Sequence, residues 1–221
     1  MIPEIIEEFR KRSNPEYAEK MSAYMRGKFE YFGLKSDQRK DIQKLFFSRM
    51  NTEIELENRW KFVRELWEKP QRELLYFAMD WVNSFNPKTL KKEDITEIHF
   101  LLTNKSWWDS VDILASNILG KYHLQFPDNQ SDWLVDWRLS KNFWLRRSCM
   151  IYQLKYRDYT DFDLLKSLIK ENVHDKEFFI QKAIGWTLRQ YGKFHPKLVV
   201  EFVEQENIKG LARREALKLI K

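Results

Sequence analysis

The chain has 221 residues, a length that suits one large domain or two small ones. Lys and Arg number 39 and Asp and Glu 33, giving a net charge of +6, and hydrophobic residues make up 43% of the chain, which excludes intrinsic disorder. Only six Gly and six Pro are present, against roughly 15 and 11 at average usage, which disfavours a turn-rich all-β fold. No apolar run approaches the roughly 18 residues of a membrane span.

The single cysteine and the N-terminal segment both favour the cytoplasm. Cys149 alone excludes an intramolecular disulfide framework and a cysteine-based zinc cluster, as is usual in a reducing compartment. Residues 1–10 form an amphipathic pattern with acidic residues, unlike a secretory signal. The four histidines are scattered without ligand spacing, so we expect no metal and no cofactor.

Apolar residues recur at helical spacing along nearly the whole chain, and alternating strand patterns are absent. We expect about a dozen helices of roughly 10–18 residues, with a loop over residues 125–131. No linker marks a boundary, so residues 1–221 are predicted to be a single domain. The start signals for helices, in chain order, are Asn14 before Pro15, Ser36 before Asp37, Asn86 before Pro87, Ser106 before Trp107, Thr160 before Asp161 and His195 before Pro196.

A repeat appears when helices that carry a polar or charged pair are aligned. The pairs begin at Arg72, Asp109, Arg146, Gln181 and Arg213, at intervals of 37, 37, 35 and 32 residues. Such a period is typical of stacked helix pairs, which form an α-solenoid with a concave surface. The sequence therefore predicts an all-α solenoid of HEAT-like repeats, with the aligned helices along the concave side.

The segment from Lys105 to Asp112 contains two candidate carboxylates. Ser106 with Asp109 three residues later is close to a capping box, which favours a structural role for Asp109. Trp107 shares a face with Val111 and is predicted to be core. Trp108 and Asp112 lie four residues apart on another face. Asp is a poor helix former, so either a function or a salt bridge must account for Asp112, and the salt bridge is the favoured explanation from the residues alone.

Basic residues occupy the equivalent positions of the following repeats. Arg146 and Arg147 form either a solvated basic face or a phosphate clamp, to which the planar guanidinium is suited. Lys182, Trp186 and Arg189 share one stripe of a later helix, and Trp186 is as compatible with a core position as with an exposed one. Cations interleaved with aromatic rings on a concave surface are typical of a nucleic-acid groove.

Several motifs resemble those of the AlkD-type DNA alkylation repair glycosylases, which are built from HEAT-like repeats. They span nearly the whole chain in the family's order: Tyr31-Phe32-Gly33, Lys105-Ser106-Trp107-Trp108-Asp109-Ser110-Val111-Asp112, Asn142-Phe143-Trp144-Leu145-Arg146-Arg147, Phe178 to Trp186, and Arg214-Glu215-Ala216-Leu217-Lys218. The resemblance implies an all-α fold with a basic, concave DNA-binding groove. It also implies double-stranded DNA with alkylated bases as the partner, and we expect a monomer that needs no membrane.

The resemblance places the site on Trp108, Asp112, Arg147 and Trp186, with Arg147 holding a phosphate beside the lesion. It adds Tyr24 as an aromatic contact at the far end of the groove. Four further basic residues are DNA-binding candidates: Arg146, Lys182, Arg189 and Arg214.

The activity implied is hydrolysis of the N-glycosidic bond of N3- or N7-alkylated purines, such as 3-methyladenine and 7-methylguanine, leaving an abasic site. A cationic purine leaves as a neutral base, so no general acid is needed. Asp112 would stabilise the oxocarbenium-like sugar or act on the attacking water, between indoles from Trp108 and Trp186. Two alternatives stay open: a noncatalytic HEAT-repeat module that binds structured or damaged DNA, and a protein-interaction scaffold.

Overall fold

The computed structural model describes residues 1–220, apart from the side chain of Ser131. It divides into two compact units, Met1–Thr89 and Leu90–Lys221, which we call the N-terminal and C-terminal units. The fold is all-α, as predicted, and the described residues contain no β-strand beyond an isolated bridge between Glu30 and Gln71. Within residues 1–220, no helix combines the length and apolarity that a membrane crossing requires.

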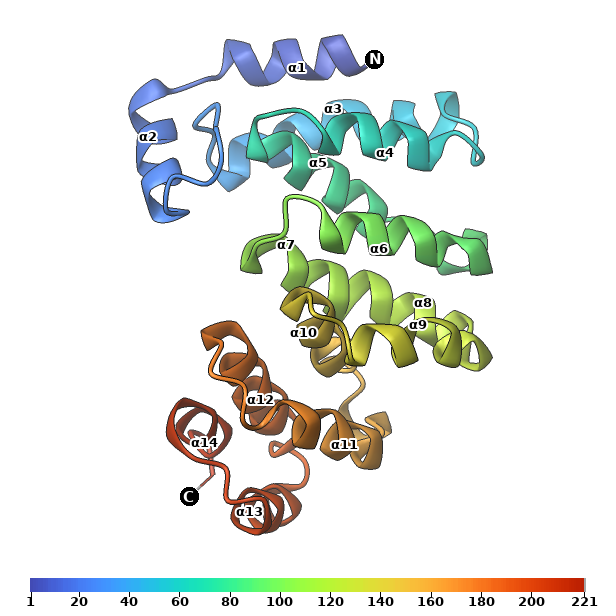
Figure 1. The fold of residues 1–221 in the computed structure, drawn as a ribbon. Coiled ribbons are helices and arrows are strands. Elements are labelled where there is room, and N and C mark those ends of the chain that lie inside the picture. The colour runs from blue at the N-terminus through green and yellow to red at the C-terminus, as the bar shows by residue number, and fades with distance from the viewer. Residues whose placement is uncertain (221) are drawn as a thin grey trace. The chain divides into compact units, whose positions relative to one another are not determined.

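The N-terminal unit contains five α-helices and a closing 3-10 turn (Figure 1). They are α1 (Ile2–Lys11), α2 (Pro15–Tyr24), α3 (Ser36–Glu53), α4 (Arg59–Trp67), α5 (Arg72–Asn83) and η1 (Pro87–Thr89). The core is aromatic: the ring of Phe77 meets those of Phe9, Phe46 and Phe47 with centroids 5.9, 6.5 and 5.2 Å away.

A buried carboxylate fixes the segment that follows α2. Glu73 on α5 is fully buried and accepts hydrogen bonds from the backbone N–H groups of Phe32, Gly33 and Leu34 at 3.0, 2.8 and 3.2 Å. Gly33 has a φ of +89°, and a Cβ there would lie 2.0 Å from the carbonyl oxygen of Asn14. Glycine is therefore required where this segment passes the start of α2.

The C-terminal unit holds the remaining elements. They are η2 (Lys92–Asp94), α6 (Ile95–Thr103), α7 (Trp108–Ile113), the π-helical segment η3 (Leu114–Leu119), α8 (Gly120–Gln125), η4 (Pro127–Asn129), α9 (Gln130–Arg138), α10 (Phe143–Ile151), η5 (Arg157–Tyr159), α11 (Phe162–Asn172), α12 (Phe178–Tyr191), α13 (Pro196–Gln205) and α14 (Gly210–Ala216). In this unit α12 packs against both α10 and α14 (Figure 1).

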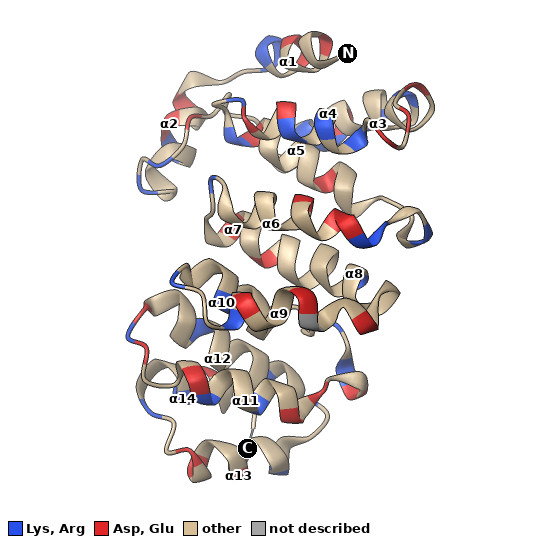
Figure 2. Cartoon of the chain, turned by 45° about the vertical axis from the view of Figure 1, so that its right-hand side comes forward, with Lys and Arg blue, Asp and Glu red and all other residues tan. Residues whose placement is uncertain are grey.

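Each position aligned for the predicted repeat lies near the start of a helix. The aligned positions fall in every case within the first four residues of a helix, namely α5, α7, α10, α12 and α14. The intervening helices are α6, α8 with α9, α11 and α13. Basic and acidic residues are interspersed along the helices of both units (Figure 2), as the small net charge suggests.

Two of the predicted helix starts are confirmed. The side chain of Asn14 accepts a hydrogen bond from the backbone N–H of Tyr17 at 2.9 Å and caps α2. His195 directly precedes α13, which begins at Pro196. Each prediction rested on a proline at the first helical position, whose fixed φ suits a helix start.

The other start signals were displaced by one residue or marked shorter elements. Ser36 is itself the first residue of α3, and Asp161, not Thr160, caps α11 by accepting from Leu164 N–H at 2.9 Å. Asn86 precedes only the single turn η1. The predicted loop over residues 125–131 is wrong, because it contains η4 and the start of α9.

The Ser106 capping prediction is also wrong. The hydroxyl of Ser106 donates to the carbonyl of Leu102 at 2.6 Å, and α7 begins two residues later, at Trp108. Asp109 remains in the first turn of α7, where a carboxylate interacts favourably with the helix dipole.

Candidate functional site

The centre of the candidate site is an ion pair between Asp112 on α7 and Arg147 on α10. Arg147 donates from Nε to Asp112 Oδ1 at 2.8 Å and from Nη2 to Oδ2 at 2.9 Å. Its Nη1 donates to the backbone carbonyl of Phe179 on α12. Both carboxylate oxygens of Asp112 are thus held in one orientation, and three helices converge on one guanidinium. The salt bridge favoured from the sequence is confirmed.

The two charged groups differ in exposure. The side chain of Arg147 is 4% exposed, whereas that of Asp112 is 20% exposed. Burial raises the pKa of Asp112, the ion pair with Arg147 opposes this rise, and the nearby charge of Asp109 adds to it. The arrangement therefore keeps one partly accessible carboxylate at fixed geometry, and burial, Arg147 and Asp109 together set its pKa.

An aromatic cluster supports the ion pair from inside the C-terminal unit. Trp107, as predicted, is core: its ring centroid lies 5.9 Å from that of Trp144 and 5.3 Å from that of Phe179. Trp144 and Phe179 are themselves 4.9 Å apart. The side chain of Asn142 caps α10 by accepting a hydrogen bond from the backbone N–H of Trp144 at 3.0 Å. The cluster thereby fixes the starts of α7, α10 and α12 relative to one another.

The two candidate tryptophans are half-buried, unlike Trp107. Trp108 is the first residue of α7 and lies one turn before Asp112. Trp186 lies on α12, seven residues after Phe179, whose carbonyl accepts from Arg147. Both indoles therefore keep part of their surface accessible on helices that contribute to the Asp112–Arg147 pair.

The helix that carries Asp112 changes its winding directly after the site. Residues Leu114–Leu119 are π-helical and continue α7 into α8 without a break. The hydroxyl of Ser116 donates to the carbonyl of Asp112 at 2.6 Å. Such single π-helical segments occur often at functional sites, because they rotate the following residues relative to the preceding ones. No sequence signal marked this one.

Of the remaining basic candidates, three form ion pairs with acidic side chains of the same unit, and the fourth is exposed. Arg146 donates to Asp175 at 2.5 Å and to Asn172 at 3.0 Å. Lys182 and Arg189, both on α12, contact Glu215. Arg214 is exposed on α14. The sequence did not indicate these acidic partners, because each lies at least 26 residues away along the chain.

Tyr24 lies in the other unit, at the end of α2. Its side chain is 72% exposed and borders a cavity of about 190 Å³. The cavity is lined by Tyr17, Lys20, Met21, Tyr24, Met25, Tyr31 and Tyr76, all of the N-terminal unit. The role of Tyr24 as an aromatic contact to DNA stays a prediction.

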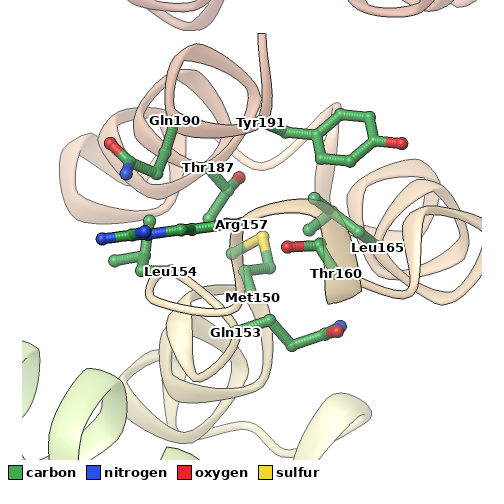
Figure 3. Close-up of a pocket in the computed structure, with 9 residues that line it drawn as sticks. All are labelled: Met150, Gln153, Leu154, Arg157, Thr160, Leu165, Thr187, Gln190 and Tyr191. Atoms are coloured by element: carbon green, nitrogen blue, oxygen red, sulfur yellow. The ribbon is translucent and has the colours of Figure 1, made fainter. Parts of the chain in front are cut away.

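A separate small cavity lies between α10, α11 and α12 and does not include the ion pair. Its volume is about 10 Å³, room for a single water molecule. Figure 3 shows the lining residues, with Arg157 extended beside Leu154 and toward Gln190: Met150, Gln153, Leu154, Arg157, Thr160, Leu165, Thr187, Gln190 and Tyr191. It is too small for a nucleobase, so this cavity is not a candidate base pocket.

Comparison with known proteins identifies the family. The model of a family described as "DNA alkylation repair enzyme" matches residues 5–220, and thus extends over both units. A solved structure described as a predicted DNA alkylation repair enzyme from Enterococcus faecalis is 32% identical, covers 94% of this chain and 96% of its own, and superposes with a TM-score of 0.86. No curated protein sequence matches the chain. The chain belongs to the DNA alkylation repair enzyme family, with DNA as its partner and a role in the repair of alkylation damage.

Proposed function

We propose that this protein is a monofunctional DNA glycosylase that excises purines carrying a positive charge from alkylation at N3 or N7. The proposal includes 3-methyladenine and 7-methylguanine in duplex DNA as substrates. It also includes action as a cytoplasmic monomer, with residues 1–221 forming one functional domain. The observation that carries it is the Asp112 carboxylate, which is fixed by Arg147 yet still partly accessible.

The reaction suits a fixed carboxylate without a general acid. When the bond between C1′ and the base nitrogen breaks, its electron pair moves to the cationic base, which departs neutral. The deoxyribose becomes positively charged at C1′ and O4′. A preorganised carboxylate stabilises this charge more than it stabilises the ground state. Asp112 takes this role, water adds its oxygen to C1′, and the proton released goes to the carboxylate or to solvent.

The two half-buried indoles complete the site. Trp108 and Trp186 would contact the lesion deoxyribose, exclude bulk water and attract the cationic sugar through their π faces. Contacts to the sugar and backbone would leave the base itself outside a pocket. Selectivity would then follow from the lability of a cationic base.

Arg147 receives a different role from the phosphate contact implied by the resemblance. Its Nε, Nη1 and Nη2 atoms already donate to Asp112 and Phe179, and its side chain is almost fully buried. We assign it as the positioning residue of Asp112. Phosphate contacts then belong to more exposed candidates, namely Lys182, Arg189, Arg214 and Arg146.

Release of bases from alkylated duplex DNA tests the proposal. We expect the wild-type protein to release 7-methylguanine and 3-methyladenine and to leave abasic sites that break only on later alkali treatment. Asp112→Asn should lower the single-turnover rate on the order of 100-fold, the usual loss when a preorganised electrostatic group is removed.

Asp109→Asn is the matched control, since it removes a carboxylate from the same helix, and it should keep most of the activity. No release by folded wild-type protein would overturn the enzyme proposal. If DNA binding that weakens with salt then persisted, the protein would be a noncatalytic DNA-binding module. Strand breakage without alkali would contradict the monofunctional assignment.

A further inference from the structure

Two cations on α12 share a single carboxylate of the last helix. Glu215 on α14 contacts Lys182 Nζ through Oε1 at 3.1 Å and Arg189 Nη1 through Oε2. Arg189 Nη1 also donates to the backbone carbonyl of Glu215 at 3.2 Å. Lys182 and Arg189 are seven residues apart, so they lie two turns apart on one face, with Trp186 between them. One acidic side chain therefore neutralises both cations that flank a candidate site residue.

Glu215 is held more firmly than a surface partner would be. Its side chain is 15% exposed, whereas that of Lys182 is 37% exposed. The hydrogen bonds from Arg189 and Lys182 lower the pKa of Glu215, so the carboxylate is ionised at neutral pH. Glu215 thus carries a negative charge at neutral pH and is less exposed than the ammonium group of Lys182.

The close approach of α14 to α12 depends on Gly185. A Cβ at this position would lie 2.4 Å from Glu215 Cβ and 2.8 Å from the carbonyl oxygen of Ala212. Glycine within a helix costs about 1 kcal/mol relative to alanine, so its presence directly before Trp186 needs a compensating reason. The reason is contact: only glycine lets α14 bring Glu215 between the two cations.

We infer that Glu215 is an internal anion that competes with DNA phosphate for Lys182 and Arg189, and so limits how tightly the protein holds DNA. The inference rests on the proposed function in that DNA is the ligand. Affinity for duplex DNA comes largely from cations that neutralise phosphates and release counterions. A lysine and an arginine already neutralised by a fixed carboxylate contribute less, because a phosphate must displace that carboxylate or bind beside it.

Two roles for Glu215 can be separated, because they predict opposite changes in DNA affinity when its carboxylate is removed. If the carboxylate served only to orient the two cations toward phosphate, its removal would weaken DNA binding. If it competes with phosphate, its removal strengthens binding. Measuring the affinity for an undamaged duplex therefore separates the two roles, without depending on excision.

The test compares Glu215→Gln with Glu204→Gln. Both raise the net charge by one, and Glu204 is matched because it is an exposed carboxylate that pairs with Arg213 of α14 at 2.5 Å. With a fluorescent undamaged duplex at low salt, Glu215→Gln should bind on the order of 10-fold more tightly than wild type, as for a new charge-assisted hydrogen bond. Its plot of log affinity against log salt should steepen by about 0.9 per phosphate gained. Glu204→Gln should change the affinity by no more than about twofold, the scale of an exposed ion pair, and should leave the slope unchanged.

A double-mutant cycle with Lys182→Gln gives a second measurement. The loss of Lys182 should weaken DNA binding more in the Glu215→Gln background than in the wild type, because only there is the ammonium group available to phosphate. Equal losses in the two backgrounds would overturn the inference. So would unchanged or weaker binding by Glu215→Gln, or an equal gain by Glu204→Gln.

A milder variant covers the case in which Glu215→Gln does not fold. Glu215→Asp keeps the charge but shortens the side chain by one methylene, and it should give a smaller gain in affinity. Thermal unfolding of each variant establishes that folded protein is compared. If the wild type excises alkylated bases but neither Glu215 variant gains DNA affinity, this inference alone is rejected. If a Glu215 variant gains DNA affinity but the wild type shows no excision, only the glycosylase proposal is rejected.

Discussion

Arg147 binds both carboxylate oxygens of Asp112, a residue 35 positions earlier in the chain, at 2.8 and 2.9 Å. This bidentate pair joins α7 to α10, and the third guanidinium nitrogen donates to α12. Because the pair is largely buried, its geometry is far better defined than that of a surface salt bridge. The consequences for activity can be measured.

Arg147→Gln should move the acid limb of the excision profile to higher pH. Burial raises the pKa of Asp112 and Arg147 opposes that rise, so removal of the arginine raises the pKa further. A larger fraction of Asp112 is then protonated at a given pH, and activity is lost earlier as the pH falls. The measurement is the single-turnover rate across a pH series. Arg146→Gln is the neighbouring control, and an identical shift in both variants would argue against a specific effect of Arg147.

Substitutions of Trp186 should distinguish a cation–π contribution of the indole from the effect of its size. We expect Trp186→Leu to slow single-turnover excision by about 2- to 30-fold, the range of about 0.5–2 kcal/mol for a cation–π contact, and Trp186→Phe to lose less. Tyr159→Leu removes another aromatic ring of the same unit, one that is 90% exposed, and should have no effect. Equal excision rates for Trp186→Leu and Trp186→Phe would contradict a cation–π role for the indole.

Glu73→Gln should destabilise the N-terminal unit without touching the candidate site. The carboxylate accepts from three backbone N–H groups, whereas an amide would turn its own NH₂ group toward some of them. Leaving buried donors unsatisfied costs about 1–3 kcal/mol in the free energy of unfolding, measurable by urea denaturation. Glu30→Gln, at an exposed carboxylate beside Gln71, should change it by well under 1 kcal/mol. A loss of stability in Glu30→Gln but not in Glu73→Gln would contradict the structural role assigned to Glu73.

Cys149 should be unreactive in the folded protein. The thiol is fully buried on α10, and burial raises its pKa, so little thiolate forms and reagents cannot reach it. We expect no reaction with a disulfide reagent at pH 8 until the protein is unfolded in denaturant. Lys218→Cys in a Cys149→Ser background provides an exposed thiol for comparison. Rapid labelling of native wild-type protein would show that α10 opens readily.

The local features of this fold were predictable because their causes are local. Helical spacing of apolar residues, few glycines and prolines before helix starts depend on neighbours within one or two turns. The position of α2 after Asn14 and of α13 after His195 followed from such signals. Starts without a proline were displaced, as at Ser106, whose hydroxyl bonds back to the preceding helix instead of capping the next.

The repeat alignment went further, since it placed Asp109, Arg146 and Gln181 at the starts of packed helices that are 35 to 37 residues apart. It could say which helices share a layer, but not which side chains meet across them. The choice between a salt bridge and a free carboxylate at Asp112 was open in the sequence, because it depends on a partner from another repeat.

The sequence by itself determined an all-α repeat fold, the helices that carry the candidate residues and the family resemblance, since these follow from periodicity and short motifs. Only the tertiary structure showed that Arg147 forms an ion pair with Asp112 and that Glu215 forms ion pairs with Lys182 and Arg189. It also showed that Gly185 permits the close approach of α14 to α12 that brings Glu215 to these cations. The physical reason is that charge pairing depends on distances of a few ångströms between helices, and those distances are set by how whole side chains pack rather than by spacing along the chain.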